Sequence, residues 1–109
     1  MTLFVTMITT KAMCAFNNNY DFQLSNTAVV NFDNTTRLLL WGNRILWKDN
    51  NTGKKYFCLC GWDTHTTCER LRGAGLPINH KRGKLYFDNQ QIDDCKVYLI
   101  DDCGRAVAQ

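Results

Sequence analysis

Apolar and polar positions alternate most regularly in the middle of the chain, where they predict a three-stranded antiparallel meander. Residues 37–41 and 44–48 are apolar-rich runs separated by Gly42-Asn43, a dipeptide suited to a two-residue hairpin turn. The polar stretch 49–53, which ends in glycine, predicts a longer turn, and residues 54–60 form the third strand. A period of two places Tyr56, Cys58 and Cys60 on one face of that strand and Lys55, Phe57 and Leu59 on the other.

A change of pattern after this meander predicts a short helix over residues 62–73. Thr66 and Glu69 have the spacing of a capping box, in which each side chain accepts a hydrogen bond from the other residue's backbone N–H. Gly73 is expected to end the helix in a left-handed conformation. A helix of about two turns is not stable alone in water, so it must pack against the rest of the protein.

A second hairpin with a basic tip is predicted after the helix. Its strands are residues 78–81 and 84–88, and Arg82-Gly83 forms the turn. Asn89-Gln90 is a further turn, and the apolar run 97–100 between acidic flanks is the last strand.

The two ends of the chain are less regular. Residues 3–8 are rich in β-branched and aromatic side chains and predict a first strand. Short strands are expected at 20–24 and 28–32, each beside Asn, Asp or Ser, and the tail from Gly104 is expected to fray.

These elements predict one α+β domain over residues 1–109, with residues 1–16 and 104–109 the least defined parts. A mainly antiparallel sheet built on the three-stranded meander is expected, with one short helix and a following hairpin. A length of 109 residues leaves no room for a second domain. The sequence leaves open whether translation starts at Met1, Met7 or Met13.

Charge is distributed unevenly along the chain, although the net charge is only +3. Residues 37–84 hold ten Lys and Arg against three acidic residues, a net charge of +7, whereas residues 88–102 hold five Asp against Lys96. The N-terminal segment lacks the basic start of a signal peptide, and no apolar run approaches the roughly 20 residues of a membrane span. We therefore expect a cytoplasmic protein with no membrane partner.

The meander, the segment 61–71 and the basic hairpin 81–87 together resemble a type of small tailed-phage protein. The shared motif is Gly-Trp-x-Thr-x-Thr-Thr-x-x-Arg-Leu at the helix start, followed by a Lys-Arg-Gly hairpin, and the likeness covers residues 37–92. Arg72 stands where that type usually has Asn, and the N-terminal third has no counterpart. The resemblance implies a viral accessory protein, commonly without assigned function, and supplies no catalytic residues.

Six cysteines and two histidines raise two chemical hypotheses, neither of which we favour. Cys58, Cys60, His65 and Cys68 lie within eleven residues and could ligate zinc, but their spacing lacks the usual pair of Cys-x2-Cys knuckles. We expect reduced, buried thiols and no metal or other cofactor. Cys68 near a helix N-terminus, with His65 or His80 as a base, suggests a nucleophile, but no orienting residue or oxyanion-hole motif accompanies it, so we expect no enzyme.

Two binding hypotheses remain, and protein binding is preferred over nucleic-acid binding. Viral proteins of this size often block a host enzyme, so the preferred function is a non-enzymatic inhibitor or modulator of a host defence or transcription protein. The positive net charge argues against mimicry of DNA. Interleaved basic and aromatic residues suit phosphate contact and base stacking, which keeps nucleic-acid binding as the alternative. The candidate binding residues are Arg70, Arg72, Lys81, Arg82, Lys84, Trp62 and Tyr86, with Trp41 and Trp47 as further aromatic anchors.

Oligomeric state stays open at this point. An exposed strand edge at residues 97–100 would allow a homodimer by strand pairing.

Overall fold

Two antiparallel sheets and two helices make up the part of the chain that the structure describes, which confirms the predicted α+β class. The structure is a computed structural model that describes residues 3–109, with side chains from Met7 onward. Met1, one of the three candidate starts, lies outside these residues.

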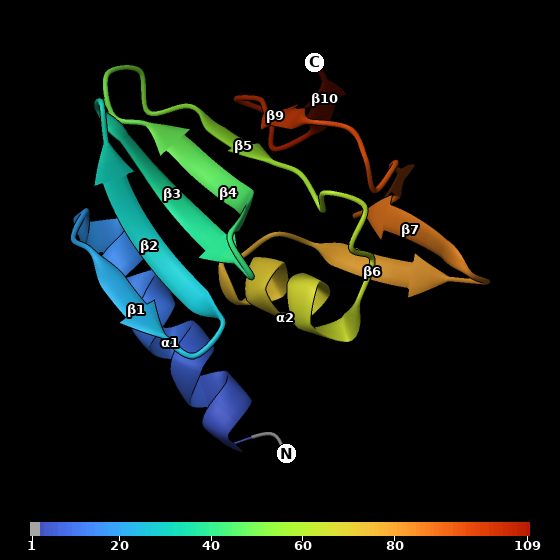
Figure 1. Cartoon of the computed structure of the whole chain (residues 1–109). Helices are drawn as coiled ribbons and strands as arrows, with labels where there is room; N and C mark the ends of the chain where they lie inside the picture. The colour runs from blue at the N-terminus through green and yellow to red at the C-terminus, as the bar shows by residue number, and fades with distance from the viewer. Residues whose placement is uncertain (1–2) are drawn as a thin grey trace.

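The elements are arranged as a large sheet, a small sheet and two helices beside them (Figure 1). The helices are α1 (Leu3–Asn18) and α2 (His65–Gly73). The large sheet has, in spatial order, β1 (Phe22–Leu24), β2 (Thr27–Phe32), β3 (Thr35–Leu40), β4 (Asn43–Asp49), β5 (Lys55–Phe57), β9 (Tyr98–Ile100) and β10 (Ala106–Ala108). The small sheet has β6 (Ile78–Lys81), β7 (Lys84–Phe87) and β8 (Gln90–Gln91).

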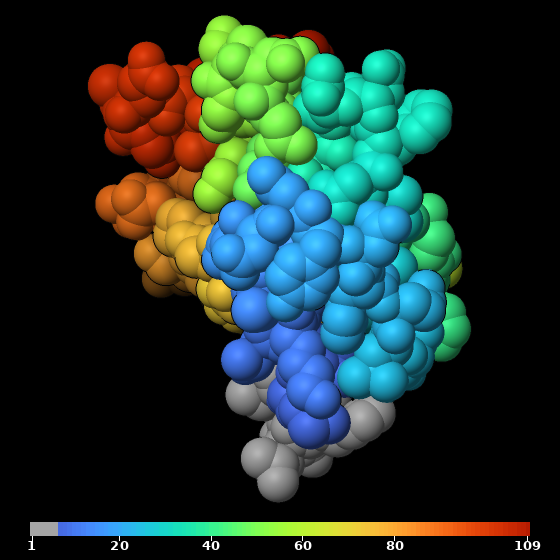
Figure 2. All heavy atoms as spheres, turned by 90° about the vertical axis from the view of Figure 1, so that its left-hand side faces the viewer, coloured from blue at the N-terminus to red at the C-terminus, as the bar shows by residue number. Residues whose placement is uncertain are grey.

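The predicted strand at residues 3–8 is wrong, because this segment is the first part of helix α1. Buried side chains on α1 recur at the spacing of one helical face: Ile8, Thr9, Ala12, Met13, Ala15 and Phe16. Packing of that face overrides the strand preference of β-branched residues. From Met7 onward, the helix and β1 lie at the front of the molecule on this side (Figure 2).

The predicted meander is present, but its first turn is shifted by one residue. Leu40 pairs with Asn43, so the two turn residues are Trp41 and Gly42 rather than Gly42 and Asn43. Both have positive φ, +52° and +80°, as a type I′ turn requires. The third strand ends at Phe57, and the next two side chains are both buried, so the predicted alternation of faces does not continue beyond it.

Helix α2 is capped differently from the prediction. Thr64 is the N-cap, and its Oγ1 accepts a hydrogen bond from the Thr67 backbone N–H at 3.2 Å. Thr66 is therefore inside the helix, and the capping box with Glu69 does not form. Gly73 is also helical, and Gly75 instead takes the left-handed conformation, at φ +94°.

The second hairpin is confirmed, with Arg82 and Gly83 as its turn residues. The following turn consists of Asp88 and Asn89, one residue earlier than predicted, because Phe87 pairs with Gln90.

The predicted frayed tail is wrong, because strand β10 pairs with β9 and is part of the large sheet. The last residue also takes part, since the Gln109 N–H donates to the Val97 carbonyl at 2.9 Å. Strand β9 in turn pairs with both β5 and β10, so residues 98–100 have no exposed edge for a dimer. Within the described chain, the edges of the large sheet are β1 and β10.

Buried residues from both sheets and both helices form one core cluster. Phe57 joins the sheets, because its ring stacks on Phe87 of β7 and on Tyr98 of β9, each at 5.3 Å between ring centroids.

Arg70 of α2 is 1% exposed and links α2 to α1 and to β2. Its Nε donates to Thr27 Oγ1 at 3.0 Å, and its Nη1 donates to Thr9 Oγ1 at 2.9 Å and to Glu69 Oε1 at 2.5 Å. The Thr9 hydroxyl itself donates to Glu69 Oε1 at 2.7 Å. These hydrogen bonds compensate for placing a charged group in the interior.

Gly73 is required where α1 and α2 approach each other, because an added Cβ would overlap the Thr9 Cγ2 methyl group. Thr9 cannot rotate away without losing its hydrogen bonds to Arg70 and Glu69.

We predict that Gly73→Ala lowers the free energy of unfolding by about 1–2 kcal/mol. The cost of overpacking against Thr9 is expected to exceed the roughly 1 kcal/mol by which alanine is more favourable than glycine in a helix. Thr9→Ser removes the obstructing methyl group but keeps the hydroxyl, so Gly73→Ala is expected to be neutral or stabilising in that background. Urea unfolding of the four proteins measures both effects. An equal loss in both backgrounds would contradict the proposed contact.

Candidate functional site

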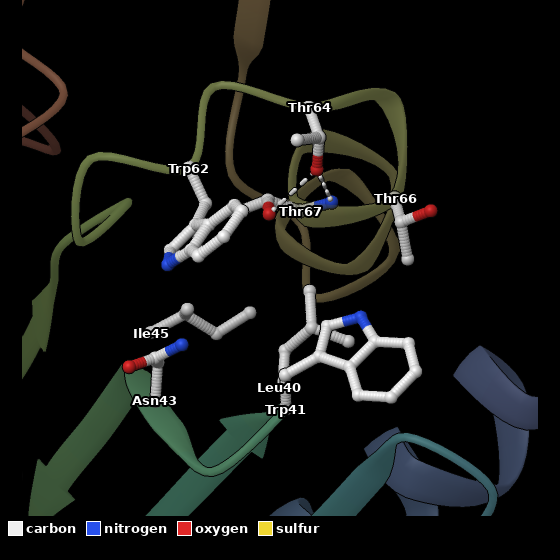
Figure 3. A pocket seen from close by; sticks show the side chains of 8 residues that line it. All are labelled: Leu40, Trp41, Asn43, Ile45, Trp62, Thr64, Thr66 and Thr67. Atoms are coloured by element: carbon white, nitrogen blue, oxygen red, sulfur yellow. Dashed lines mark hydrogen bonds between the residues drawn. The ribbon is translucent and has the colours of Figure 1, made fainter.

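A cleft lies between the β3–β4 turn and the N-terminus of α2. Its volume is about 470 Å³, and two tryptophans, Trp41 from the turn and Trp62 from the loop before α2, stand at its sides (Figure 3). The other lining residues are Leu40, Asn43, Ile45, Thr64, Thr66 and Thr67. The N-cap hydrogen bonds of α2 fix the threonine wall of the cleft, since they join Thr64 and Thr67.

Both tryptophans of the cleft are exposed. Trp41 has 74% of its surface open to solvent and Trp62 has 56%. Trp47, by contrast, is buried, and its ring stacks on Tyr56 and lies 3.8 Å beneath the Arg44 guanidinium. Two of the three tryptophans are therefore available to a binding partner.

The position of Trp41 is unfavourable for folding alone. A large side chain at φ +52° is strained, and Gly, Asn or Asp would satisfy the same turn at lower free energy. Its ring is mostly in water, so burial does not offset that strain. Trp41 is thus a residue that the turn disfavours and the core does not use.

A second candidate site is the tip of the β6–β7 hairpin. Lys81, Arg82, Lys84 and Tyr86 line one shallow concavity of about 430 Å³ there. Lys81 Nζ lies 5.7 Å from the centre of the Tyr86 ring. Four of the seven predicted binding residues are thus brought together.

The other three predicted binding residues lie elsewhere. Trp62 is in the cleft rather than at the hairpin tip. Arg72 is exposed, but its Nη1 donates to the Ile78 carbonyl at 3.0 Å and so ties α2 to β6. Arg70 is buried in the interhelical hydrogen-bond network and does not reach a binding surface, which corrects its assignment as a binding residue.

The four residues considered as a zinc set do not converge within the described part of the chain. Cys60 Sγ donates to the Arg44 carbonyl at 3.3 Å, and His65 is exposed in the first turn of α2. Burial, reinforced by Cys58, raises the pKa of the Cys60 thiol to about 11.

A different group forms around Cys68, where Asp63 and His80 approach the thiol. His80 Nε2 lies 2.5 Å from Asp63 Oδ1, and Cys68 Sγ donates to the same carboxylate oxygen at 3.7 Å. Burial and the Asp63 carboxylate raise the pKa of Cys68 to about 11, so the thiol is protonated at neutral pH. The carboxylate is also in the wrong place for nucleophilic catalysis, in which the imidazole lies between thiol and carboxylate.

The sequence prediction named Trp41 only as a further aromatic anchor, outside the seven candidate binding residues, and did not name Asp63. The sequence did not place Trp41 in a site because the predicted turn was one residue too late, which left this tryptophan within a strand. A Trp-Gly pair read as the two turn residues would have indicated an exposed ring. Nothing in the sequence relates Asp63 to His80, which are brought together only by the packing of β6 beside α2.

These features define a small α+β domain with an aromatic cleft and a separate basic hairpin tip. The chain belongs to the Kyanoviridae Gp96 protein family, whose model matches residues 5–99. It is therefore a tailed-phage protein, as the resemblance of residues 37–92 implied. No curated protein and no solved structure matches the chain. Neither helix of the described chain combines the length and hydrophobicity that crossing a membrane requires.

We predict that iodoacetamide at pH 8 labels the exposed Cys14 and Cys103 of the native protein but leaves Cys68 unmodified. The raised pKa keeps Cys68 protonated until the pH approaches about 11, and burial hinders a reagent that is much larger than a metal ion. Peptide mass mapping measures the labelling, and denatured protein, in which all six cysteines react, is the control. Preferential labelling of Cys68 would contradict this and would restore the nucleophile hypothesis.

Proposed function

We propose that this phage protein binds a host protein in the cytoplasm through the cleft between Trp41 and Trp62, and thereby inhibits or modulates that protein without catalysis. The observation that carries the proposal is the pair of exposed tryptophans on the two sides of one cleft. Tryptophan is among the residues that contribute most to binding free energy at protein interfaces.

The cleft suits an apolar side chain presented by a partner protein. Leu40 and Ile45 contribute apolar surface, and the two indole rings can enclose an inserted side chain from either side. Burial of both rings on binding would remove a large apolar area from water. The threonine wall offers polar groups for orientation of the partner.

Charge separation along the chain supports binding to a protein with an uneven surface potential. The segment 37–84 contains both sides of the cleft and has a net charge of +7, whereas residues 88–102 are acidic. Such a distribution orients a partner during approach and accelerates association at low salt.

We predict that the double variant Trp41→Asn/Trp62→Ala fails to retain a partner that the wild-type protein captures from host lysate. Asn suits the left-handed turn position, so the ring is removed without strain, and folding is expected to be preserved. Loss of one interface tryptophan typically weakens binding by about 30-fold or more, which titration of the purified partner measures.

Phe32→Ala is the matched control, because Phe32 is an aromatic residue that is 64% exposed and lies outside the cleft. This variant is expected to retain the partner. Capture is carried out with and without nuclease, since a partner bridged by nucleic acid would disappear on digestion. Equal retention by the cleft variant and the wild-type protein would exclude the cleft as the binding site.

Nucleic-acid binding at the β6–β7 tip is a second candidate function, favoured by the grouping of three cations around Tyr86. The cations suit phosphates and the ring suits base stacking. The sequence pI of about 8.6 is below that of typical basic nucleic-acid-binding domains, which ranks this function second.

We predict that, if this second function operates, Lys81→Ala/Arg82→Ala/Lys84→Ala abolishes binding of labelled single-stranded DNA or RNA at low salt. Lys54→Ala/Lys55→Ala/Lys96→Ala removes the same charge from other exposed positions and is expected to retain most of the binding. Fluorescence anisotropy measures both. Equal losses would show general charge attraction rather than a hairpin site, and absence of wild-type binding would exclude the function.

A further inference from the structure

Three side chains of different chemistry converge where the loop before α2, α2 itself and strand β6 meet. They are Asp63, Cys68 and His80, and one potential ligand atom from each lies within 4.8 Å of the other two. The Cys68 thiol is buried, whereas the Asp63 and His80 side chains are 30% and 40% exposed. The group is thus closed on the protein side and open toward solvent.

We propose that Asp63, Cys68 and His80 bind a zinc ion. A thiolate, an imidazole and a carboxylate are the three ligand types of zinc sites in proteins, and three protein ligands leave a fourth position for water. The exposed side chains give the ion a path to the thiolate.

The separations in the structure are close to those that one ion requires. Two ligand atoms about 2.0–2.3 Å from a tetrahedral zinc ion lie roughly 3.3–3.6 Å apart. Cys68 Sγ and Asp63 Oδ1 are 3.7 Å apart, which fits. Asp63 Oδ1 and His80 Nε2 are 2.5 Å apart. Metal binding therefore replaces their direct contact and increases the distance between these two atoms by about 1 Å. Both of these side chains are partly in solvent, which leaves room for that adjustment.

Ligand chemistry favours zinc over the hard cations. Calcium and magnesium prefer sites built from several oxygen atoms, whereas this group supplies one carboxylate beside sulfur and nitrogen. A second group, Asp93, Asp94 and Cys95, consists of near neighbours in one loop. Its contacts are explained by local turn structure, since Asp93 Oδ1 accepts from the Cys95 N–H at 2.7 Å.

Zinc at this position would fasten the β6–β7 hairpin to α2. Cys68 and His80 belong to the helix and the hairpin respectively, and at present Arg72 is a further polar link between them, through the Ile78 carbonyl. An ion bound only by the folded protein raises the free energy of unfolding, by an amount that grows with the logarithm of the ion concentration above the dissociation constant. This inference is independent of the proposed partner-binding cleft.

The test is zinc binding by the full-length reduced protein, measured by competition with a chromophoric chelator. The wild-type protein is expected to bind one equivalent. His80→Asn and Cys68→Ser are each expected to weaken binding at least 100-fold, because loss of a ligand costs more than the 10–100-fold typical of residues that only support a ligand. His80 is exposed, so His80→Asn remains informative even if Cys68→Ser destabilises the fold.

His65→Asn and Cys95→Ser are the matched controls, since they replace the other histidine and a cysteine of the second group. Both are expected to bind zinc like the wild-type protein. Cobalt substitution gives a second readout, because a thiolate-to-cobalt charge-transfer band is expected in the wild-type protein and in both controls but not in Cys68→Ser. Absence of zinc binding, or loss of binding in a control instead of in His80→Asn, would overturn the proposal.

Discussion

The structure depends on one buried guanidinium. Arg70 lies at the junction of α1, α2 and β2, and each of these elements offers it an oxygen atom. A cation in the interior is tolerated only when its donors are satisfied, so the three elements must be present together in a single arrangement. Arg70 therefore specifies how the helices lie on the sheet more sharply than apolar packing, which accepts many similar arrangements. Gly73 and Thr9 complete the junction by permitting close approach of the helices.

Helix α2 has only nine residues, yet it contributes side chains to three different parts of the structure. Its inner face supplies Leu71 and Arg70 to the interior, its N-terminal threonines form one wall of the aromatic cleft, and Cys68 faces Asp63 and His80. Because the same short helix borders the cleft and the Cys68 group, anything that moves the helix affects both. The position of this short helix is fixed at its N-terminus by the N-cap hydrogen bond of Thr64 and along its inner face by the hydrogen bonds of Arg70.

Sequence patterns predicted the elements that depend on neighbouring residues. Both hairpins and the α+β class followed from alternation and turn chemistry, because a two-residue turn fixes the strands on either side of it. Features that depend on distant residues were not predictable. Helix α1 was mistaken for a strand because its β-branched residues were weighed without the sheet that its apolar face covers. Arg70 was assigned to the surface because a lone arginine on a short helix is usually solvated, and its partners, Thr9 and Thr27, are remote in sequence.

The strand order also has a consequence for how the chain folds. Strands β1 to β5 each pair with the next in sequence, but β5 then pairs with β9, so residues 58–97 form one excursion between two adjacent strands. Pairing of the first strands costs little conformational entropy, because the loops between them are short. Pairing of β9 with β5 costs more, because it closes this long loop. The excursion holds α2, the basic hairpin and the Cys68 group. We therefore expect residues 58–97, which carry most of the candidate chemistry, to become ordered late in folding, when β9 pairs with β5.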